Sequence, residues 1–372
     1  MGRLSGVRPT LLVFLPLAAA SFTVALAAVL WLVPRVRDFA ARIGAVQAGG
    51  GAHGSGVRQH AGVLPNIGGI AILGGFLLAV LAGSLVAPQL IDEYRVELLA
   101  IALGGALMTL VGFIDDMWEV PPALRLATQV VAAGILVANG VRIGFVTDYF
   151  GSASFLFIPE TLAVAVTVLW VVGFTNAFNF IDGLDGLSSG IAAISSMSLL
   201  AVALQFDDRG AAVLILAALA GSALGFLRYN FGPATIIMGD SGAYLLGYVL
   251  AAVSVLGALK VTAAISVVAP ILVLALPVVN ITQVTLRRLR RGSSPALASN
   301  DHIHDLIRVR SGSKRLTVVL LWGATLVLGV LGMLLSSTPP VLTLLTLVVT
   351  VVAIAVVSLV RLAEVRHAGN PV

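Results

Sequence analysis

The sequence contains no cysteine and only five histidines, and only 10% of its 372 residues are charged. The lack of cysteine excludes disulfide bonds, thiolate metal sites, cysteine nucleophiles and palmitoylation. The scarcity of charge accompanies a hydrophobic content of 59%. An ordinary soluble domain, which has about 25% charged and about 45–50% apolar residues, is therefore excluded.

What the sequence has in abundance is long apolar runs. They predict an all-α, polytopic membrane protein, because a membrane helix needs about 20 consecutive apolar residues. The strands of a porin-like barrel would instead alternate apolar and polar residues. Eleven spans are expected, at residues 10–33, 67–87, 96–114, 126–141, 162–178, 187–206, 211–227, 236–256, 261–284, 316–335 and 341–360. The first exceeds the apolar core of about 7–15 residues in a signal peptide, so we expect a retained span.

The distribution of basic residues predicts the orientation of these spans. With a cytoplasmic C-terminus, sixteen of the 22 Lys and Arg residues lie on the cytoplasmic side, as the positive-inside rule requires. The expected location is thus the inner (plasma) membrane, with the bilayer as a partner and no nucleic acid. We expect one polytopic domain over residues 1–372, with cytoplasmic catalytic loops at 34–66, 115–125, 179–187, 228–240 and 285–315.

Five of the acidic residues in these cytoplasmic joints belong to the polar clusters, and a carboxylate at membrane depth is costly unless it meets a cation, water or headgroups. They are Asp115, Asp116, Asp182, Asp185 and Asp240. Each has an ordinary alternative explanation: a solvated helix end for the adjacent pair, an Asx turn for the next two, and a helix N-cap for Asp240. Together they would repel an anionic substrate unless a metal ion inverts the local field.

Amide and histidine side chains accompany these acids. Asn176 and Asn179 recur at i and i+3, on one helical face with Asp182 if the helix continues. Such oxygen ligands favour Mg²⁺, with Mn²⁺ as an alternative, over Zn²⁺. His302 and His304 lie beside several basic residues, which suits a sugar diphosphate or, equally, anionic lipid headgroups. The residues alone therefore predict a Mg²⁺ enzyme acting on a phosphorylated substrate at the inner face.

Five polar or glycine-rich motifs follow one another along the chain between about residues 58 and 310. They are His60-Ala-Gly-Val-Leu-Pro65-Asn-Ile-Gly68-Gly69, Gly112-Phe-Ile-Asp115-Asp116, Asn176-Ala-Phe-Asn179-Phe-Ile-Asp182-Gly-Leu-Asp185-Gly-Leu, Tyr229-Asn230-Phe followed by Met238-Gly-Asp240-Ser-Gly242, and His302-Ile-His304. In this order they resemble the polyprenyl-phosphate N-acetylhexosamine-1-phosphate transferase family. The resemblance implies that undecaprenyl (polyprenyl) phosphate attacks the sugar-linked phosphorus of a UDP-N-acetylhexosamine, releasing UMP and forming a lipid-diphosphate sugar. Direct displacement and a covalent enzyme intermediate both stay open.

The resemblance also implies roles for the polar residues. Asp115 and Asp116 would act at the attacking phosphate, with Asp182 among the catalytic acids. Asp240 would ligate Mg²⁺, with Asn179 nearby. The residues expected to bind substrate are His60, Asn176, Asp185 and Asn230, the last two at the uridine, and His302 and His304 at the diphosphate or sugar. Dimers are common among relatives, so a homodimer is a further expectation.

Two stretches indicate the branch of the family. The Leu-Pro-Asn-Ile-Gly-Gly stretch at 64–69 and the histidine pair split by Ile303 resemble the branch that transfers N-acetylglucosamine-1-phosphate to start cell-envelope glycans such as lipopolysaccharide, teichoic acid or arabinogalactan. The sequence departs from the family at Ile237, usually Phe, at Asp305, where the closest relatives carry a third His, and at Ala243, commonly Ser. None of these departures removes a residue assigned to catalysis.

Four alternative interpretations remain at this point. One is the phospho-N-acetylmuramoyl-pentapeptide transferase of the same family. A membrane transporter would carry ionisable residues near span centres or on both faces. A CDP-alcohol phosphotransferase would show Ala-Arg shortly after its first Asp-Gly, where this chain has Leu184-Asp185. A catalytically inactive relative is the fourth, suggested by the departures at Ile237 and Asp305.

Overall fold

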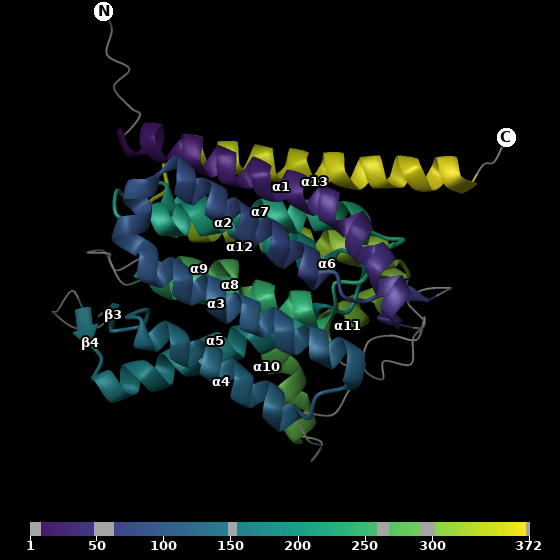
Figure 1. Cartoon of the computed structure of the whole chain (residues 1–372), viewed down its shortest axis with the longest axis horizontal. Helices are drawn as coiled ribbons and strands as arrows, with labels where there is room; N and C mark the ends of the chain where they lie inside the picture. The colour runs from purple at the N-terminus through teal and green to yellow at the C-terminus, as the bar shows by residue number, and fades with distance from the viewer. Residues whose placement is uncertain (1–8, 48–62, 148–154, 259–267, 291–301, 370–372) are drawn as a thin grey trace, which may run out of the picture.

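The computed structural model describes residues 9–47, 63–147, 155–258, 268–290 and 302–369. This part of the chain is almost entirely helical, and most helix axes lie roughly along the long axis of the molecule (Figure 1). The helices are α1 (Pro9–Ile43), α2 (Gly69–Val86), α3 (Pro88–Trp118), α4 (Pro122–Ala138), α5 (Glu160–Ile181), α6 (Leu187–Ala203), α7 (Gly210–Asn230), α8 (Gly239–Ala258), α9 (Val268–Val273), α10 (Ala275–Arg290), α11 (Ile303–Ser311), α12 (Lys314–Leu335) and α13 (Pro340–Gly369). Two antiparallel pairs of short strands join them: β1 (Val46–Gln47) with β2 (Leu64–Pro65), and β3 (Phe145–Thr147) with β4 (Phe155–Phe157).

Helices α7 and α8 form the centre of the bundle. Their apolar windows are completely buried inside the protein, whereas those of α12 and α13 are only 39% and 28% buried. Helices α1 and α6 pack on α7, and α3 and α5 pack on α8. The many Ala and Gly residues of α7 explain this arrangement, since small side chains let helix backbones approach closely within a membrane.

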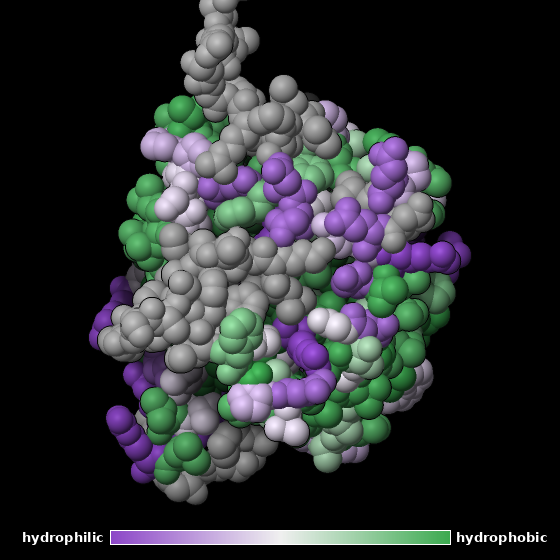
Figure 2. Space-filling model, turned by 90° about the vertical axis from the view of Figure 1, so that its left-hand side faces the viewer, coloured by the Kyte–Doolittle hydropathy of each residue, from purple (hydrophilic) through white to green (hydrophobic). Residues whose placement is uncertain are grey.

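The expected class, a multi-pass α-helical membrane protein, is confirmed. In the described part, eight helices are long and apolar enough to cross a membrane, and α4 and α6 are shorter apolar helices. Seen from the end that carries β3 and β4, hydrophilic side chains gather on the end face and hydrophobic ones lie toward its margins (Figure 2). The count of eleven spans stays a prediction, because the ninth begins outside the described residues.

The described part of that ninth span is not one helix. It breaks at Leu274, between α9 and α10. Pro277 accounts for the break, since proline has no N–H to donate to the carbonyl four residues earlier, at Val273.

The helices also run further than the apolar windows predicted. Helix α1 continues to Ile43 and α3 to Trp118, into segments expected to be loops. In α1, Val36 and Ala40 are buried, so the helix keeps an apolar face against its neighbours after its charged residues begin. The two strand pairs were not predicted, because strands of two or three residues are too short for a periodic pattern.

Two glycines allow the polar end of α8 to approach its neighbours. A Cβ at Gly112 of α3 would lie 2.3 Å from the Ser241 nitrogen, and one at Gly69 of α2 would lie 2.1 Å from the Gly242 nitrogen. Both distances are far below van der Waals contact with backbone atoms that cannot easily move. Helices α2 and α3 therefore meet the first turn of α8 only because these positions lack a side chain.

Gly112→Ala is expected to lower the stability of the protein by about 1–3 kcal/mol, because the added methyl group forces α3 away from α8. Thermal unfolding in detergent measures this change. Gly134→Ala is the matched control, since a Cβ there meets nothing within 4 Å and the residue is exposed on α4. Equal melting temperatures for the two variants would contradict the close approach of α3 and α8.

Candidate active site

Asp116, at the end of α3, binds the first turn of α8. Its Oδ1 accepts the Asp240 N–H at 2.8 Å and its Oδ2 accepts the Ser241 N–H at 3.2 Å. Helix N-terminal N–H groups have no partner within their own helix, and a carboxylate is the favoured acceptor there. Gly239 takes a left-handed φ of +73°, and a Cβ at that position would lie 2.4 Å from Asp116 Oδ2. The sequence thus folds so that residues 124 positions apart meet.

Asp240 is adjacent to Asp116 and is also contacted by a side chain of a second helix, α5. The Asn179 Nδ2 of α5 donates to Asp240 Oδ1 at 2.6 Å. The alternative explanation of Asp240 as the N-cap of its own helix does not hold, because α8 already begins at Gly239 and Asp240 lies within its first turn. Asn66, just after β2, donates from Nδ2 to the Asp116 carbonyl at 3.1 Å. The expected proximity of Asn179 and Asp240 is therefore present.

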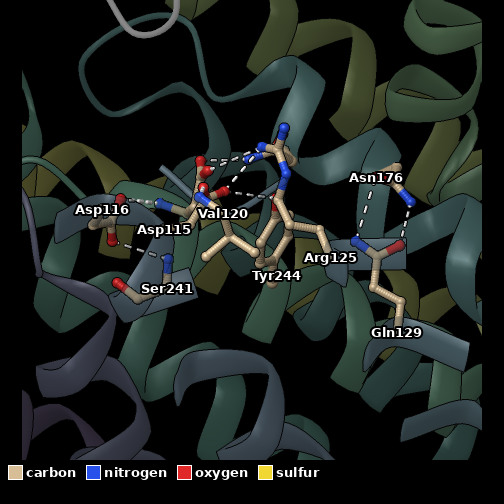
Figure 3. Close-up of polar contacts among 10 residues, drawn as sticks. Asp115, Asp116, Val120, Arg125, Gln129, Asn176, Ser241 and Tyr244 are labelled. Carbon is tan, nitrogen blue, oxygen red and sulfur yellow. Dashed lines mark hydrogen bonds and ion pairs between the residues drawn. The ribbon is translucent and has the colours of Figure 1, made fainter. Parts of the chain in front are cut away.

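Asp115 faces a different partner from its neighbour. It is buried, and the Arg125 guanidinium lies 2.9 Å from its Oδ2 (Figure 3). The Val120 N–H donates to its Oδ1 at 2.7 Å, and the Tyr244 hydroxyl lies 3.4 Å from its Oδ2. Arg125 also lies 3.9 Å from Asp240 Oδ2, so one guanidinium stands between two of the predicted acids. This pairing excludes the solvated helix end as an explanation of Asp115.

The loop between α5 and α6 carries the other two acids. Ser188 donates to Asp182 Oδ1 at 2.5 Å. Burial raises the pKa of the Asp182 carboxyl to about 7; the Ser188 hydrogen bond opposes this rise, and the charges of Asp240 and Asp185 add to it. Helix α5 ends at Ile181, so Asp182 does not continue the helical face of Asn176 and Asn179. The condition for a shared face, a helix that continues through Asp182, is therefore not met, although the charge of Asp240 still acts on Asp182.

Asp185 and Asn230 hold the α7–α8 loop. Asp185 Oδ2 accepts the Ala234 N–H at 3.2 Å. Asn230 is buried; its Oδ1 accepts the Gly186 N–H at 2.9 Å and its Nδ2 donates to the Ile236 carbonyl at 3.0 Å. Both ends of the Asn230 amide are thus engaged with backbone, and its expected position at the uridine stays a prediction.

The same loop is held from the far end of the chain. Arg361 of α13 donates to the Pro233 carbonyl at 2.6 Å, and Arg315 of α12 donates to the Gly232 carbonyl at 3.2 Å. Arg228, at the end of α7, pairs with Glu364 of α13 at 2.5 Å. Basic residues late in the sequence therefore support the loop that leads into Asp240.

The two histidines stack on one another beside the α5–α6 loop. The ring centroids of His302 and His304 lie 5.2 Å apart, with an interplanar angle of 6°. His304 packs against Gly183, where a Cβ would lie 2.0 Å from its Nε2. Burial lowers the pKa of His304 to about 4, and the charge of Arg308 acts in the same direction. His304 is therefore neutral at physiological pH.

Asn176, a further predicted residue, contacts a different partner. Asn176 pairs with Gln129 of α4, donating from Nδ2 to Oε1 at 2.6 Å (Figure 3). His60 lies outside the described residues.

Among the described residues, no group of three or more His, Asp or Glu side chains could hold a metal ion alone. Mg²⁺ seldom needs such a group, because it keeps several waters and binds one or two carboxylates together with substrate phosphates. Asp240 and Asn179 fit that pattern. The Asn179 Nδ2 donates a hydrogen bond to Asp240, which leaves the Asn179 side-chain oxygen as the atom suited to a cation. The atoms available to ligate a metal ion at this point are therefore all oxygens.

Sequence reasoning missed several residues that support the site: Asn66, Arg125, Gln129, Ser188, Tyr244 and Asn280. Arg125 had a signal, because it is the sole basic residue in its expected joint. Tyr244 and Ser188 had none, since their partners are set by tertiary contacts alone.

Comparison with known proteins places this geometry in a family. The model of "Glycosyl transferase family 4" matches residues 98–258, the stretch from α3 to α8 that contains the central acids. The chain is also 31% identical over 320 residues to a "Probable undecaprenyl-phosphate N-acetylglucosaminyl 1-phosphate transferase" of Bacillus subtilis, covering 85% of this chain and 84% of that protein. The chain belongs to glycosyl transferase family 4.

Other relatives of this family 4 glycosyl transferase carry similar names. A "Decaprenyl-phosphate N-acetylglucosaminephosphotransferase" of Mycobacterium leprae is 32% identical over 71% of each chain. An "Undecaprenyl-phosphate alpha-N-acetylglucosaminyl 1-phosphate transferase" of Escherichia coli K12 is 26% identical over 74% of each chain. The predicted family, and its N-acetylglucosamine branch, are therefore confirmed.

Proposed function

We propose that this protein transfers N-acetylglucosamine-1-phosphate from UDP-N-acetylglucosamine to undecaprenyl (polyprenyl) phosphate and releases UMP. The observation that carries the proposal is the group of Asp116, Asp240 and Asn179 at one end of the bundle, in a chain whose relatives are named for this transfer. In the reaction, an oxygen of the lipid phosphate bonds to the sugar-linked phosphorus. The bond from that phosphorus to the bridging oxygen breaks, and UMP leaves with the oxygen.

The site residues supply charge and position for two anions that must meet. Arg125, between Asp115 and Asp240, is placed to attract phosphoryl oxygens. Asp116 holds α8 and orients the attacking phosphate, which is already ionised at neutral pH and needs no strong base. Alignment of the two substrates, rather than proton transfer, is then the main source of catalysis.

A divalent cation is part of the proposal. Asp240 and Asn179 would hold Mg²⁺, or Mn²⁺ in its place, and the ion would neutralise the donor diphosphate. The all-oxygen donor set supports this choice. His302 and His304 lie beside the α5–α6 loop, where we assign them to the diphosphate or the sugar.

We further propose that the site faces the cytoplasm. Arg125, Arg228, Arg315 and Arg361 all contact residues at the site end of the bundle. This clustering supports the positive-inside orientation of a plasma-membrane protein. The acceptor would then enter from the inner leaflet.

UMP release by the purified protein tests the proposal, with undecaprenyl phosphate, Mg²⁺ and either of two donors. We expect UMP with UDP-N-acetylglucosamine and none with UDP-N-acetylmuramoyl-pentapeptide. Release with the pentapeptide alone would move the protein to the other branch. Release with neither donor would contradict the proposed reaction, and would give weight to Ile237 and Asp305 as marks of a changed pocket.

A further inference from the structure

Asn280 of α10 is completely buried and joins two separate parts of the site. Its Nδ2 donates to the Phe180 carbonyl near the end of α5 at 3.2 Å. Its Oδ1 accepts the Ile303 N–H at 2.9 Å, in the first turn of α11. Its Nδ2 also lies 3.4 Å from His302 Nδ1. One side chain thus connects the last turn of α5 with the segment that carries both histidines.

The two backbone contacts fix which way the amide points. A carbonyl can only accept and an N–H can only donate, so the nitrogen must face Phe180 and the oxygen must face Ile303. The reversed amide would set donor against donor and acceptor against acceptor. The second hydrogen of Nδ2 is then directed at His302, and a ring nitrogen that accepts a hydrogen bond carries no proton.

We infer that Asn280 is a positioning residue, which holds His302 in the tautomer protonated on Nε2 and fixes its ring beside the α5–α6 loop. A neutral imidazole has one donor and one acceptor nitrogen, and the partner of one nitrogen sets the role of the other. With Nδ1 accepting, the Nε2–H is the donor of His302.

The surroundings of His302 agree with a neutral ring of fixed orientation. Its ring stacks on His304 and lies 5.6 Å from the Phe180 ring, measured between centroids. The same Phe180 ring also contacts the Arg288 guanidinium, which lies 5.8 Å from the ring centroid. Asp305 and Arg308 of α11 pair with each other at 3.8 Å. Of the contacts described above, that of Asn280 Nδ2 is made to a ring nitrogen of His302, so it bears directly on the tautomer.

The consequence for catalysis rests on the proposed function. If His302 meets the donor diphosphate, an Nε2–H donor is available to a phosphoryl oxygen without protonation of the ring. Asn280 then acts on substrate affinity through His302 and does not itself touch the substrate.

The test is the tautomer of His302, read by nitrogen NMR of protein labelled with ¹⁵N-histidine and assigned by the signal lost in His302→Gln. We expect an unprotonated Nδ1 and a protonated Nε2. In Asn280→Asp, the carboxylate keeps the acceptor for the Ile303 N–H but cannot donate, so His302 Nδ1 is expected to become protonated. Asn139→Asp is the control, because Asn139 is exposed just after the end of α4 and its Nδ2 donates to a backbone carbonyl, that of Ile135.

Kinetics give the second measurement. Asn280→Ala is expected to raise the KM for UDP-N-acetylglucosamine about tenfold, as for one lost hydrogen bond to a charged group, with a smaller change in kcat. A wild-type His302 protonated on Nδ1, or an unchanged spectrum in Asn280→Asp, would overturn the inference even if transfer is normal. The expected tautomer in a protein without transfer activity would instead overturn the proposed function and leave the positioning role of Asn280 intact.

Discussion

Asp240→Asn is expected to reduce UMP release at least about a thousandfold, the scale of losing one electrostatic contact to the transition state. The substitution removes one negative charge from the group that would hold Mg²⁺. The fold is expected to survive, because the amide oxygen of the new side chain can still accept the Asn179 hydrogen bond. Turnover is measured in detergent, with the melting temperature as the check on folding.

Asp207→Asn is the matched control for this loss. Asp207 is an exposed acid between α6 and α7, at the opposite end of the bundle, and its substitution is expected to change turnover less than about twofold, as for an ordinary surface position. Asp116→Asn is also expected to abolish transfer, but its two oxygens each accept a backbone N–H, so an amide would also weaken the start of α8. Near-normal turnover of Asp240→Asn would refute the site.

Removal of divalent cations is expected to abolish UMP release entirely. Two anionic substrates must come together beside several carboxylates, and without a cation their repulsion opposes binding. EDTA should stop turnover, and excess Mg²⁺ or Mn²⁺ should restore it. Turnover that survives the chelator would contradict the proposed metal dependence.

Direct binding distinguishes a metal site from a general ionic effect. Mn²⁺ bound to the wild-type protein can be counted by electron paramagnetic resonance with UDP-N-acetylglucosamine present. We expect one bound ion in the wild type, none in Asp240→Asn and one in Asp207→Asn. Equal binding by all three proteins would assign the ion to another place.

The polar joints of the site were predictable because they stand out against an apolar background. A pair such as Asp115-Asp116 directly after an apolar run cannot be indifferent to a membrane, and that local signal located the site. Which partner each acid meets was not predictable. Asp115 pairs with Arg125 and Asp116 with α8, although the two acids are adjacent in sequence.

The fold shows the same division. Apolar windows located most helices, but the extension of α1 to Ile43 depends on tertiary burial of residues such as Ala40. The break between α9 and α10 falls within the apolar stretch 268–279, where hydrophobicity alone cannot distinguish one helix from two. Asn280 had no sequence signal either, since its importance comes from Phe180 and His302, which reach it from other elements.

The contacts that α13 makes with the α7–α8 loop and with the end of α7 have a consequence for biosynthesis. A chain is made and inserted from its N-terminus, so α3, α5 and α8 are in the membrane before Arg361 leaves the ribosome. Until α13 arrives, the Pro233 carbonyl lacks its guanidinium partner and Arg228 lacks Glu364. The loop leading to Asp240 is therefore completed last, and a chain cut short before α13 keeps all the central acids but not the finished loop.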